Sequence, residues 1–212
     1  MTQITAITLK APIEGLPTPE DFVEMARPAP DLPEGGFLAR TLCFSVDPGT
    51  RSRLSAGASY AFPLKPGEVI DGFAVAEVIE TRSPHFAVCQ TVAMGGGWAD
   101  HQVFGGRGYV QLIRDEGIPL SAWIGVLGIP GMTSWFGLHR VGQVKAGDTV
   151  LISSAAGPVG ATAGQLARKA GAARVVGIAG GPVKCAWLVE HAGFDAVVDY
   201  KTTSDLDAAL RD

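Results

Sequence analysis

The sequence predicts an α/β protein in which a β-rich first part precedes alternating strands and helices. Gly (28 residues) and Pro (14) make up about a fifth of the 212 residues, against a usual value of about 12%, and such punctuation is typical of a turn-rich β domain. Strand-like segments dominate residues 1–118, and from residue 119 the apolar spacing becomes helical and then alternates. We therefore expect a β domain over 1–118 and an α/β domain over 119–212.

The first part reads as a series of short strands around a Pro-rich stretch at residues 12–33. Alternating or β-branched and aromatic segments predict strands at residues 3–10, 37–46, 69–81 and 109–113. Residues 91–94 and 98–104 flank Gly95-Gly96-Gly97 and predict a hairpin. Several short strands of this kind indicate a small barrel or sandwich.

The second part predicts a β-α-β-α-β-α unit after two helices at residues 120–127 and 133–141, the second capped by Thr133. The strands are expected at 149–154, 174–179 and 196–199, and the helices at 159–170, 182–191 and 205–211. Residues 149–154 are continuously apolar, as in a strand buried on both faces. This order implies a parallel sheet with crossover helices.

Composition excludes several classes of protein. The net charge of −4 is scattered along the chain, which excludes a basic nucleic-acid footprint. No apolar run reaches the ~18–20 residues that span a bilayer, and the N-terminus does not resemble a signal peptide. Three separated cysteines predict no disulfide framework. We expect a cytoplasmic protein without a membrane or nucleic-acid partner.

The most informative local signal is the Gly-rich turn Ala155-Ala-Gly157-Pro-Val-Gly160, with Gly164 one helical turn later. Residues with little side chain let the backbone approach a pyrophosphate, whose charge faces the N–H groups at the helix start. A structural turn of small residues is the alternative. Because the turn follows a buried strand and opens a helix within a β-α-β unit, the sequence favours dinucleotide binding.

The end of the second strand favours NADP(H) over NAD(H). Folds that prefer NAD carry Asp or Glu there to bind the ribose 2′-hydroxyl, whereas this strand ends in Gly180-Gly181. Lys184 follows and can meet a 2′-phosphate. The alternative is a solvated lysine, but a cation in the first turn opposes the helix dipole, which favours a functional reason.

Six segments carry a resemblance to a known family. They begin with Ser45-Val-Asp-Pro48 and Arg51, continue with Pro66-Gly-Glu68 to Gly72 and with residues 125–133, and end with 154–165, 177–184 and 193–201. In this order they resemble the zinc-independent medium-chain dehydrogenase/reductases, in the group of the prostaglandin (leukotriene B4) reductases and NADP-dependent alkenal double-bond reductases. The resemblance implies a GroES-like barrel domain, a Rossmann domain, and NADPH in the cleft between them.

The resemblance also implies roles for particular residues. By position, the turn made by Gly157, Pro158, Val159 and Gly160 holds the pyrophosphate. Lys184 and Tyr200 contact the adenosine 2′-phosphate, and Thr133 lies beside the nicotinamide half.

A zinc site is not predicted. Zinc alcohol dehydrogenases of the same superfamily carry Gly-His-Glu where this chain reads Pro66-Gly67-Glu68, so the His ligand is missing. His85, Cys89 and His101 offer nitrogen and sulfur ligands, but their spacing matches no common zinc motif.

The implied reaction is hydride transfer from NADPH to the β-carbon of an α,β-unsaturated ketone or aldehyde, after which the enolate oxygen needs a hydrogen-bond donor. The sequence identifies no catalytic residue. Gly49 and Leu64 stand where some relatives carry tyrosine, and Tyr60 is either a cleft residue or a strand-edge aromatic.

A Rossmann domain has six strands, and this chain supplies three. We therefore expect a fragment, with an open edge on the strand at 149–154, weak NADPH binding and little activity. The family resemblance implies that the parent is a homodimer. Its substrates would be enones, alkenals or quinones. The alternatives are an NADPH quinone reductase of the same superfamily and a non-enzymatic nucleotide-binding fragment.

Overall fold

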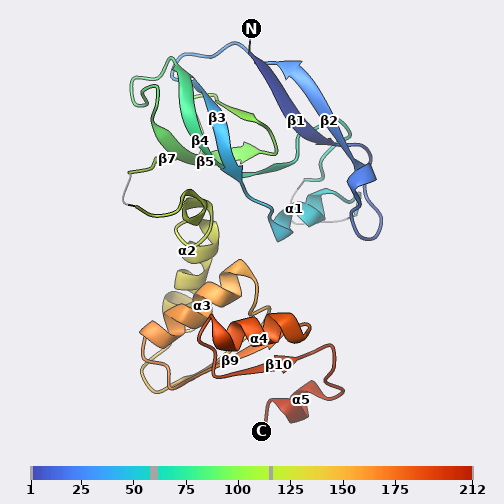
Figure 1. Ribbon diagram of the computed structural model, residues 1–212, viewed down its shortest axis with the longest axis vertical. Coiled ribbons are helices and arrows are strands. Elements are labelled where there is room, and N and C mark those ends of the chain that lie inside the picture. Colours follow the sequence, from blue (N-terminus) through green and yellow to red (C-terminus); the bar gives the residue numbers. More distant parts are fainter. Residues whose placement is uncertain (1, 58–61, 115–116, 212) are drawn as a thin grey trace. The chain divides into compact units, whose positions relative to one another are not determined.

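The computed structural model describes residues 2–57, 62–114 and 117–211, which form two units, Met1–Ile124 and Gly125–Asp212 (Figure 1). Each unit is considered by itself. The domain boundary expected after residue 118 stays a prediction, and Tyr60 lies outside the described residues.

The first unit is built on a curled antiparallel sheet with the strand order β6-β3-β4-β5-β7. Its strands are β3 (Phe37–Phe44), β4 (Asp71–Thr81), β5 (Thr91–Gly97), β6 (His101–Phe104) and β7 (Val110–Leu112). A second sheet pairs β1 (Gln3–Leu9) with β2 (Phe22–Pro28). Isolated bridges from Ala6 to Ala99 and from Thr8 to Val69 join β1 to the segments beside the larger sheet. This arrangement confirms the predicted barrel-like β domain.

Aromatic packing fills the curled sheet. The fully buried ring of Phe37 lies 5.2 Å from that of Phe86 and 4.9 Å from that of Phe104, measured between centroids. Val78 and Met94 from the neighbouring strands complete this cluster. Irregularities in the β3–β4 register, after Leu38 and after Thr41, accompany the curl.

The predicted hairpin of residues 91–104 is wrong. β5 pairs with β4 and β7, whereas β6 pairs with β3. The three glycines continue β5 instead of making a turn, since they pair with residues 71–73 of β4. A Cβ at Gly97 would lie 2.7 Å from the carbonyl oxygen of Ile70, the residue before β4. The sequence also predicts neither β2, which lies inside the Pro-rich stretch, nor the short helix α1 (Pro48–Arg53).

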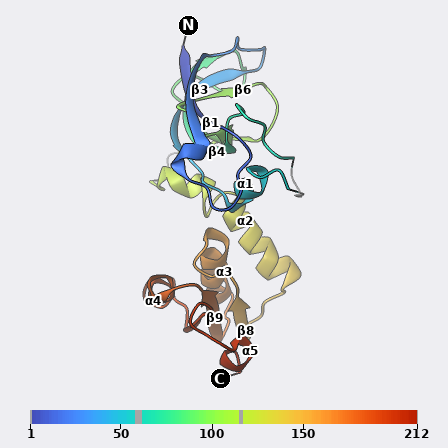
Figure 2. The same ribbon diagram turned by 90° about the vertical axis from the view of Figure 1, so that its right-hand side faces the viewer.

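The second unit contains a three-stranded parallel sheet in the order β10-β9-β8, which confirms the predicted first half of a Rossmann fold. The strands are β8 (Thr149–Ile152), β9 (Arg174–Ala179) and β10 (Ala196–Asp199), and the helices are α3 (Pro158–Lys169), α4 (Pro182–Glu190) and α5 (Leu206–Ala209). Helix α3 packs on β8 and β9 (Figure 2). Helix α4 packs on β9 and β10.

Two predictions for this unit need correction. β8 is not buried on both faces, since the Leu151 side chain is half-exposed. Within the described residues β8 pairs only with β9, so it has the open edge that was expected.

Thr133 is not an N-cap, because α2 (Ile129–Phe136) begins earlier, with Gly128 at its N-cap and Pro130 in its first turn, where proline is favoured.

The elements around α2 also differ from the prediction. The chain runs through a 3-10 helix (Leu120–Ile124) before α2 and a π-helical turn (Gly137–Val141) after it. No helix within the described part of the chain combines the length and the apolar character needed to cross a membrane.

Phe194 is the central side chain of the second core. It packs with Val175 and Leu188, both fully buried. A Cβ at Gly164 of α3 would overlap the Phe194 ring, and one at Gly177 of β9 would lie 3.0 Å from its Cδ1. These two glycines therefore make the space that the ring occupies.

Asp195, the next residue, fastens this core to α3 and β9. Its carboxylate accepts a 2.6 Å hydrogen bond from the Val175 N–H and pairs with the Arg168 guanidinium at 2.8 Å. The Arg168 hydrogen bond, followed by that from Val175, holds the pKa of Asp195 below its ordinary value.

We expect Gly164→Ala to lower the free energy of unfolding of the second unit. The new methyl group overlaps the Phe194 ring, and overpacking of this kind costs about 1–3 kcal/mol, more than the ~1 kcal/mol that alanine gains over glycine in a helix. Gly137→Ala is the matched control, because a Cβ there meets nothing within 4 Å. Urea unfolding followed by circular dichroism measures both, and an equally stabilised Gly164→Ala variant would contradict this account of the core.

Candidate functional site

A pocket of about 370 Å³ lies at the carboxyl ends of β8 and β9 in the second unit. The residues that line it come from the strand ends, the two turns that follow them, the first turn of α4 and the turn after β10: Ser153, Ser154, Ala156, Gly157, Ile178, Ala179, Gly180, Lys184 and Tyr200. In open parallel sheets, ligands bind at this edge. Of the predicted site residues, Gly157, Lys184 and Tyr200 are brought together here.

The turn from β8 to α3 is held by close backbone contacts. The Gly157 N–H donates to the Ser154 carbonyl at 2.9 Å, and Pro158 begins the helix. A Cβ at Gly160 would lie 2.5 Å from the Ser154 carbonyl oxygen and 2.8 Å from the Ala155 Cα. Only glycine lets the first turn of α3 come this near to the strand end.

This helix start offers free donors. The backbone N–H groups of Val159 and Gly160 have no hydrogen-bond acceptor among the described residues. They stand next to Gly157, which lines the pocket. Unpaired N–H groups and the helix dipole together favour an anion at such a position.

Tyr200 lies against Gly180. A Cβ at Gly180 would be 2.8 Å from the Cε1, Cζ and hydroxyl oxygen atoms of Tyr200, so the ring lies over a residue that must lack a side chain. The Tyr200 N–H donates to the Ala179 carbonyl at 3.1 Å, which fixes the start of the turn after β10. Tyr200 is 55% exposed and lines the pocket.

Lys184 supplies a positive charge at the same pocket. It lies in the first turn of α4, which begins after Gly181 with a φ of +94°, and its side chain is exposed. Within the described part of the chain no carboxylate lies within ion-pairing distance of its ammonium group. The charge is therefore free for a ligand.

The remaining predicted residues have other places. Pro158, Val159 and Gly160 form the first turn of α3 beside the pocket without being part of its lining. Thr133 is exposed in the middle of α2 and does not line this pocket. Helix α2 is fastened to α3 by its next residue, Ser134, whose hydroxyl donates to the Val159 carbonyl at 2.8 Å.

Two features of the site were not recognised in the sequence. Asp199, the last residue of β10, accepts hydrogen bonds from two backbone N–H groups of the turns around the pocket. Ser154, which lines the pocket, has a positive φ of +49°. Non-glycine residues with a positive φ cluster at functional sites, but no sequence pattern predicts a positive φ for a serine.

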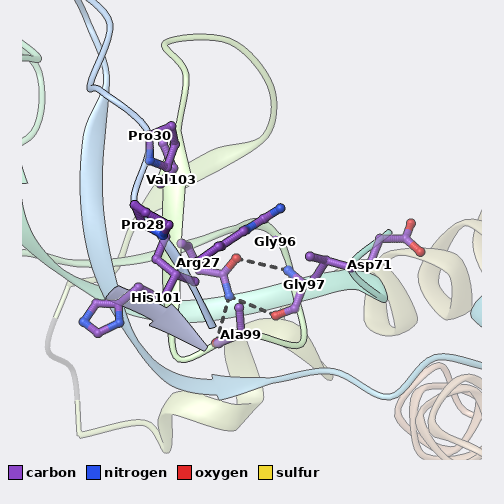
Figure 3. A pocket seen from close by; sticks show the side chains of 12 residues that line it. Arg27, Pro28, Pro30, Asp71, Gly96, Gly97, Ala99, His101 and Val103 are labelled. Carbon is purple, nitrogen blue, oxygen red and sulfur yellow. Dashed lines mark hydrogen bonds between the residues drawn. The ribbon is translucent and has the colours of Figure 1, made fainter. Parts of the chain in front are cut away.

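A second pocket, of about 400 Å³, lies in the first unit and contains none of the predicted residues. Figure 3 shows its His101 and Asp71 side chains pointing in opposite directions, so these two groups do not converge on one ligand. The buried amide of Gln102 holds the neighbouring loop through the backbone of Gly97 and Ala99. Arg27 brings a positive charge to this pocket, but the lining comes from strands and loops and includes no helix start.

The metal ligands considered in the sequence are not assembled. Among the described residues no three His, Cys, Asp or Glu side chains are placed to share a metal ion. His101 instead lies with its Nδ1 atom 2.9 Å from the Asp100 carboxylate.

Comparison with known proteins defines the class. Residues 5–112 match the family model described as the N-terminal domain of oxidoreductase. The chain belongs to this oxidoreductase family. The predicted resemblance to the prostaglandin and alkenal reductases of the medium-chain dehydrogenase/reductases is confirmed by its similarity to relatives with those names.

Particular relatives agree with this assignment. The chain is 36% identical over 214 residues to prostaglandin reductase 1 of Bos taurus, covering 100% of this chain and 62% of the relative. It is 36% identical over 209 residues to the 2-alkenal reductase (NADP(+)-dependent) of Nicotiana tabacum, covering 97% and 61%. CurA from Vibrio vulnificus in complex with NADPH superimposes with a TM-score of 0.86 at 34% identity, covering 97% and 60%. The chain thus spans less than two thirds of the length of these relatives.

We expect Ser154→Gly to stabilise the second unit by up to about 1 kcal/mol, because glycine adopts a positive φ without the steric cost that serine bears. Ser153→Gly is the control, since the neighbouring serine has no positive φ and glycine there only adds backbone entropy to the unfolded chain. Thermal unfolding measures both. A Ser154→Gly variant destabilised as much as Ser153→Gly would show that the serine conformation carries no strain.

Proposed function

We propose that this protein is an NADPH-dependent oxidoreductase that reduces the C=C bond of α,β-unsaturated ketones or aldehydes by hydride transfer, without a metal. The observation that carries the proposal is the pocket that joins Gly157, Lys184 and Tyr200 at the strand ends. It is supported by relatives named prostaglandin reductase 1 and 2-alkenal reductase (NADP(+)-dependent), and by the likeness to a CurA structure that contains NADPH.

The residues of the second unit fit this cofactor. The turn from Gly157 through Pro158 and Val159 to Gly160 would hold the pyrophosphate, because it brings unpaired N–H groups and a helix N-terminus to the pocket. A side chain at Gly160 would push this helix start away from the strand.

Lys184 and Tyr200 would bind the adenosine 2′-phosphate. An ammonium group and a phenol hydroxyl both donate to phosphate oxygens, and no ion pair with a described residue competes for Lys184. β9 ends at Ala179 and Gly180 follows, so the end of this strand carries no carboxylate of the kind with which NAD-preferring folds bind the ribose hydroxyl. Thr133 is assigned to the nicotinamide half on the family resemblance alone.

When bound, NADPH supplies the hydride. The residues of this chain then act by binding and orientation: the helix start fixes the pyrophosphate, and Lys184 with Tyr200 fixes the adenosine end. We assign no proton donor. The proposal includes a cytoplasmic location and a homodimeric whole protein, which rest on the three separated cysteines and on the family resemblance.

Quinone reduction receives less support. Quinone oxidoreductases from Coxiella burnetii and Escherichia coli share the fold, with TM-scores of 0.75 and 0.76, at only 22% and 18% identity. Similarity at this level of identity shows a shared fold and does not indicate which substrate is preferred.

We expect Lys184→Met to weaken NADPH binding by about 10- to 100-fold, because a charge-assisted hydrogen bond to phosphate contributes about 1.5–3 kcal/mol. NADH lacks the 2′-phosphate, so its dissociation constant is expected to change by less than about 3-fold. Fluorescence titration measures both cofactors. Lys169→Met, which removes another exposed lysine from the end of α3, is the control and is expected to bind like the wild type. Equal losses for NADPH and NADH would contradict the assignment of Lys184.

An assay of NADPH consumption with an alkenal, an enone and a benzoquinone at equal concentrations tests the reaction itself. We expect the alkenal or enone to be reduced at least about 10-fold faster than the quinone, because the named relatives act on such compounds. A faster reaction with quinone would favour the quinone reductase. NADPH binding without turnover of any of the three compounds would favour the alternative of a non-enzymatic nucleotide-binding fragment.

A further inference from the structure

We propose that Asp199 is a positioning residue for recognition of the 2′-phosphate. A single carboxylate oxygen ties the start of the helix that carries Lys184 to the turn that carries Tyr200. This inference rests on the proposed NADPH function, and it concerns a residue that lies outside the Gly-rich turn and outside the lining of the pocket.

The carboxylate joins two segments that are distant in the chain. Asp199 Oδ1 accepts a 2.9 Å hydrogen bond from the Gly181 N–H and a 3.0 Å hydrogen bond from the Lys201 N–H. Gly181 is the N-cap of α4 and has a φ of +94°, which glycine adopts without steric cost. Since Lys184 lies in the first turn of α4, the Gly181 contact determines where that helix begins.

The other contacts of Asp199 hold the turn that contains Tyr200. The Asp199 carbonyl accepts from the N–H groups of Thr202 and Thr203, at 3.2 and 3.0 Å. With the side-chain bond to Lys201 and the bond from the Tyr200 N–H to Ala179, the backbone on both sides of Tyr200 is fixed. The ring is thereby held over Gly180.

Asp199 also places a negative charge beside the site proposed for a phosphate. The N–H groups of Gly181 and then Lys201 hold the pKa of Asp199 below its ordinary value, so the side chain is ionised at neutral pH. Burial, and secondly the negative charge of Asp199, raise the pKa of the Cys185 thiol in α4. The charge of Asp199 therefore acts on the start of that helix. The negative charge of Asp199 opposes phosphate binding, whereas its hydrogen bonds to the Gly181 and Lys201 N–H groups favour binding by holding the segments of Lys184 and Tyr200 in place.

Geometry and charge can therefore be separated by substitution. Asparagine keeps an Oδ1 acceptor for both N–H groups and removes the charge, whereas alanine removes both. If positioning is the role, Asp199→Asn binds the 2′-phosphate as well as the wild type or better, and Asp199→Ala binds it worse.

The test uses 2′,5′-ADP and 5′-AMP, which differ only in the 2′-phosphate, titrated by calorimetry into the 212-residue chain. We expect Asp199→Ala to weaken 2′,5′-ADP binding by at least about 10-fold and 5′-AMP binding by less than about 3-fold, as the loss of a held charge-assisted contact implies. Asp199→Asn is expected to bind 2′,5′-ADP with the wild-type affinity or up to a few-fold tighter, since it only loses a like charge. Asp207→Ala, which removes an exposed carboxylate from α5, is the control and is expected to behave as the wild type.

Three outcomes would overturn the inference: unchanged 2′,5′-ADP binding by Asp199→Ala, equal weakening of the two probes, or an Asp199→Asn variant that loses the preference for 2′,5′-ADP. An asparagine variant that loses this preference overturns the inference even where the alanine variant does not fold. A wild-type chain that binds both probes equally, or neither, would instead overturn the proposed NADPH function, and this inference with it.

Discussion

The second unit depends on how closely the first turn of α3 approaches the backbone at the end of β8. At Gly160 a side chain would collide with the Ser154 carbonyl and the Ala155 Cα. This approach places the helix start, with its unpaired N–H groups, at the edge of the sheet where the pocket lies. It also brings α3 down onto the sheet, where Gly164 faces Phe194. One steric constraint thus shapes both the site and the core.

The polar contacts around the pocket serve a similar purpose. Lys184 comes from the first turn of α4 and Tyr200 from the turn after β10, so the two donors belong to separate segments. Asp199 and the Gly180–Tyr200 contact hold the two turns together. A phosphate is recognised well only when its donors are already in place, because ordering them on binding would cost conformational entropy.

The first unit shows where local sequence patterns mislead. Residues 91–104 look like a hairpin because three glycines separate two apolar segments. In the structure the glycines extend β5 along β4, and Gln102 holds the following loop so that β6 pairs with β3. The Pro-rich stretch hides β2, which is the outer partner of β1, and edge strands tolerate proline.

The sequence by itself determined the order of strands and helices in the second unit, the Gly-rich turn and the lysine that follows a strand end without an acid. These features are local: each depends on residues within one turn or one strand. The bounds of β9 and β10 match the prediction for the same reason. Only the tertiary structure decided which strands pair in the first unit, why Gly180 must lie beneath Tyr200, and that Asp199 joins the two turns. Those contacts link residues far apart in the chain, and their partners are defined by packing and not by sequence spacing.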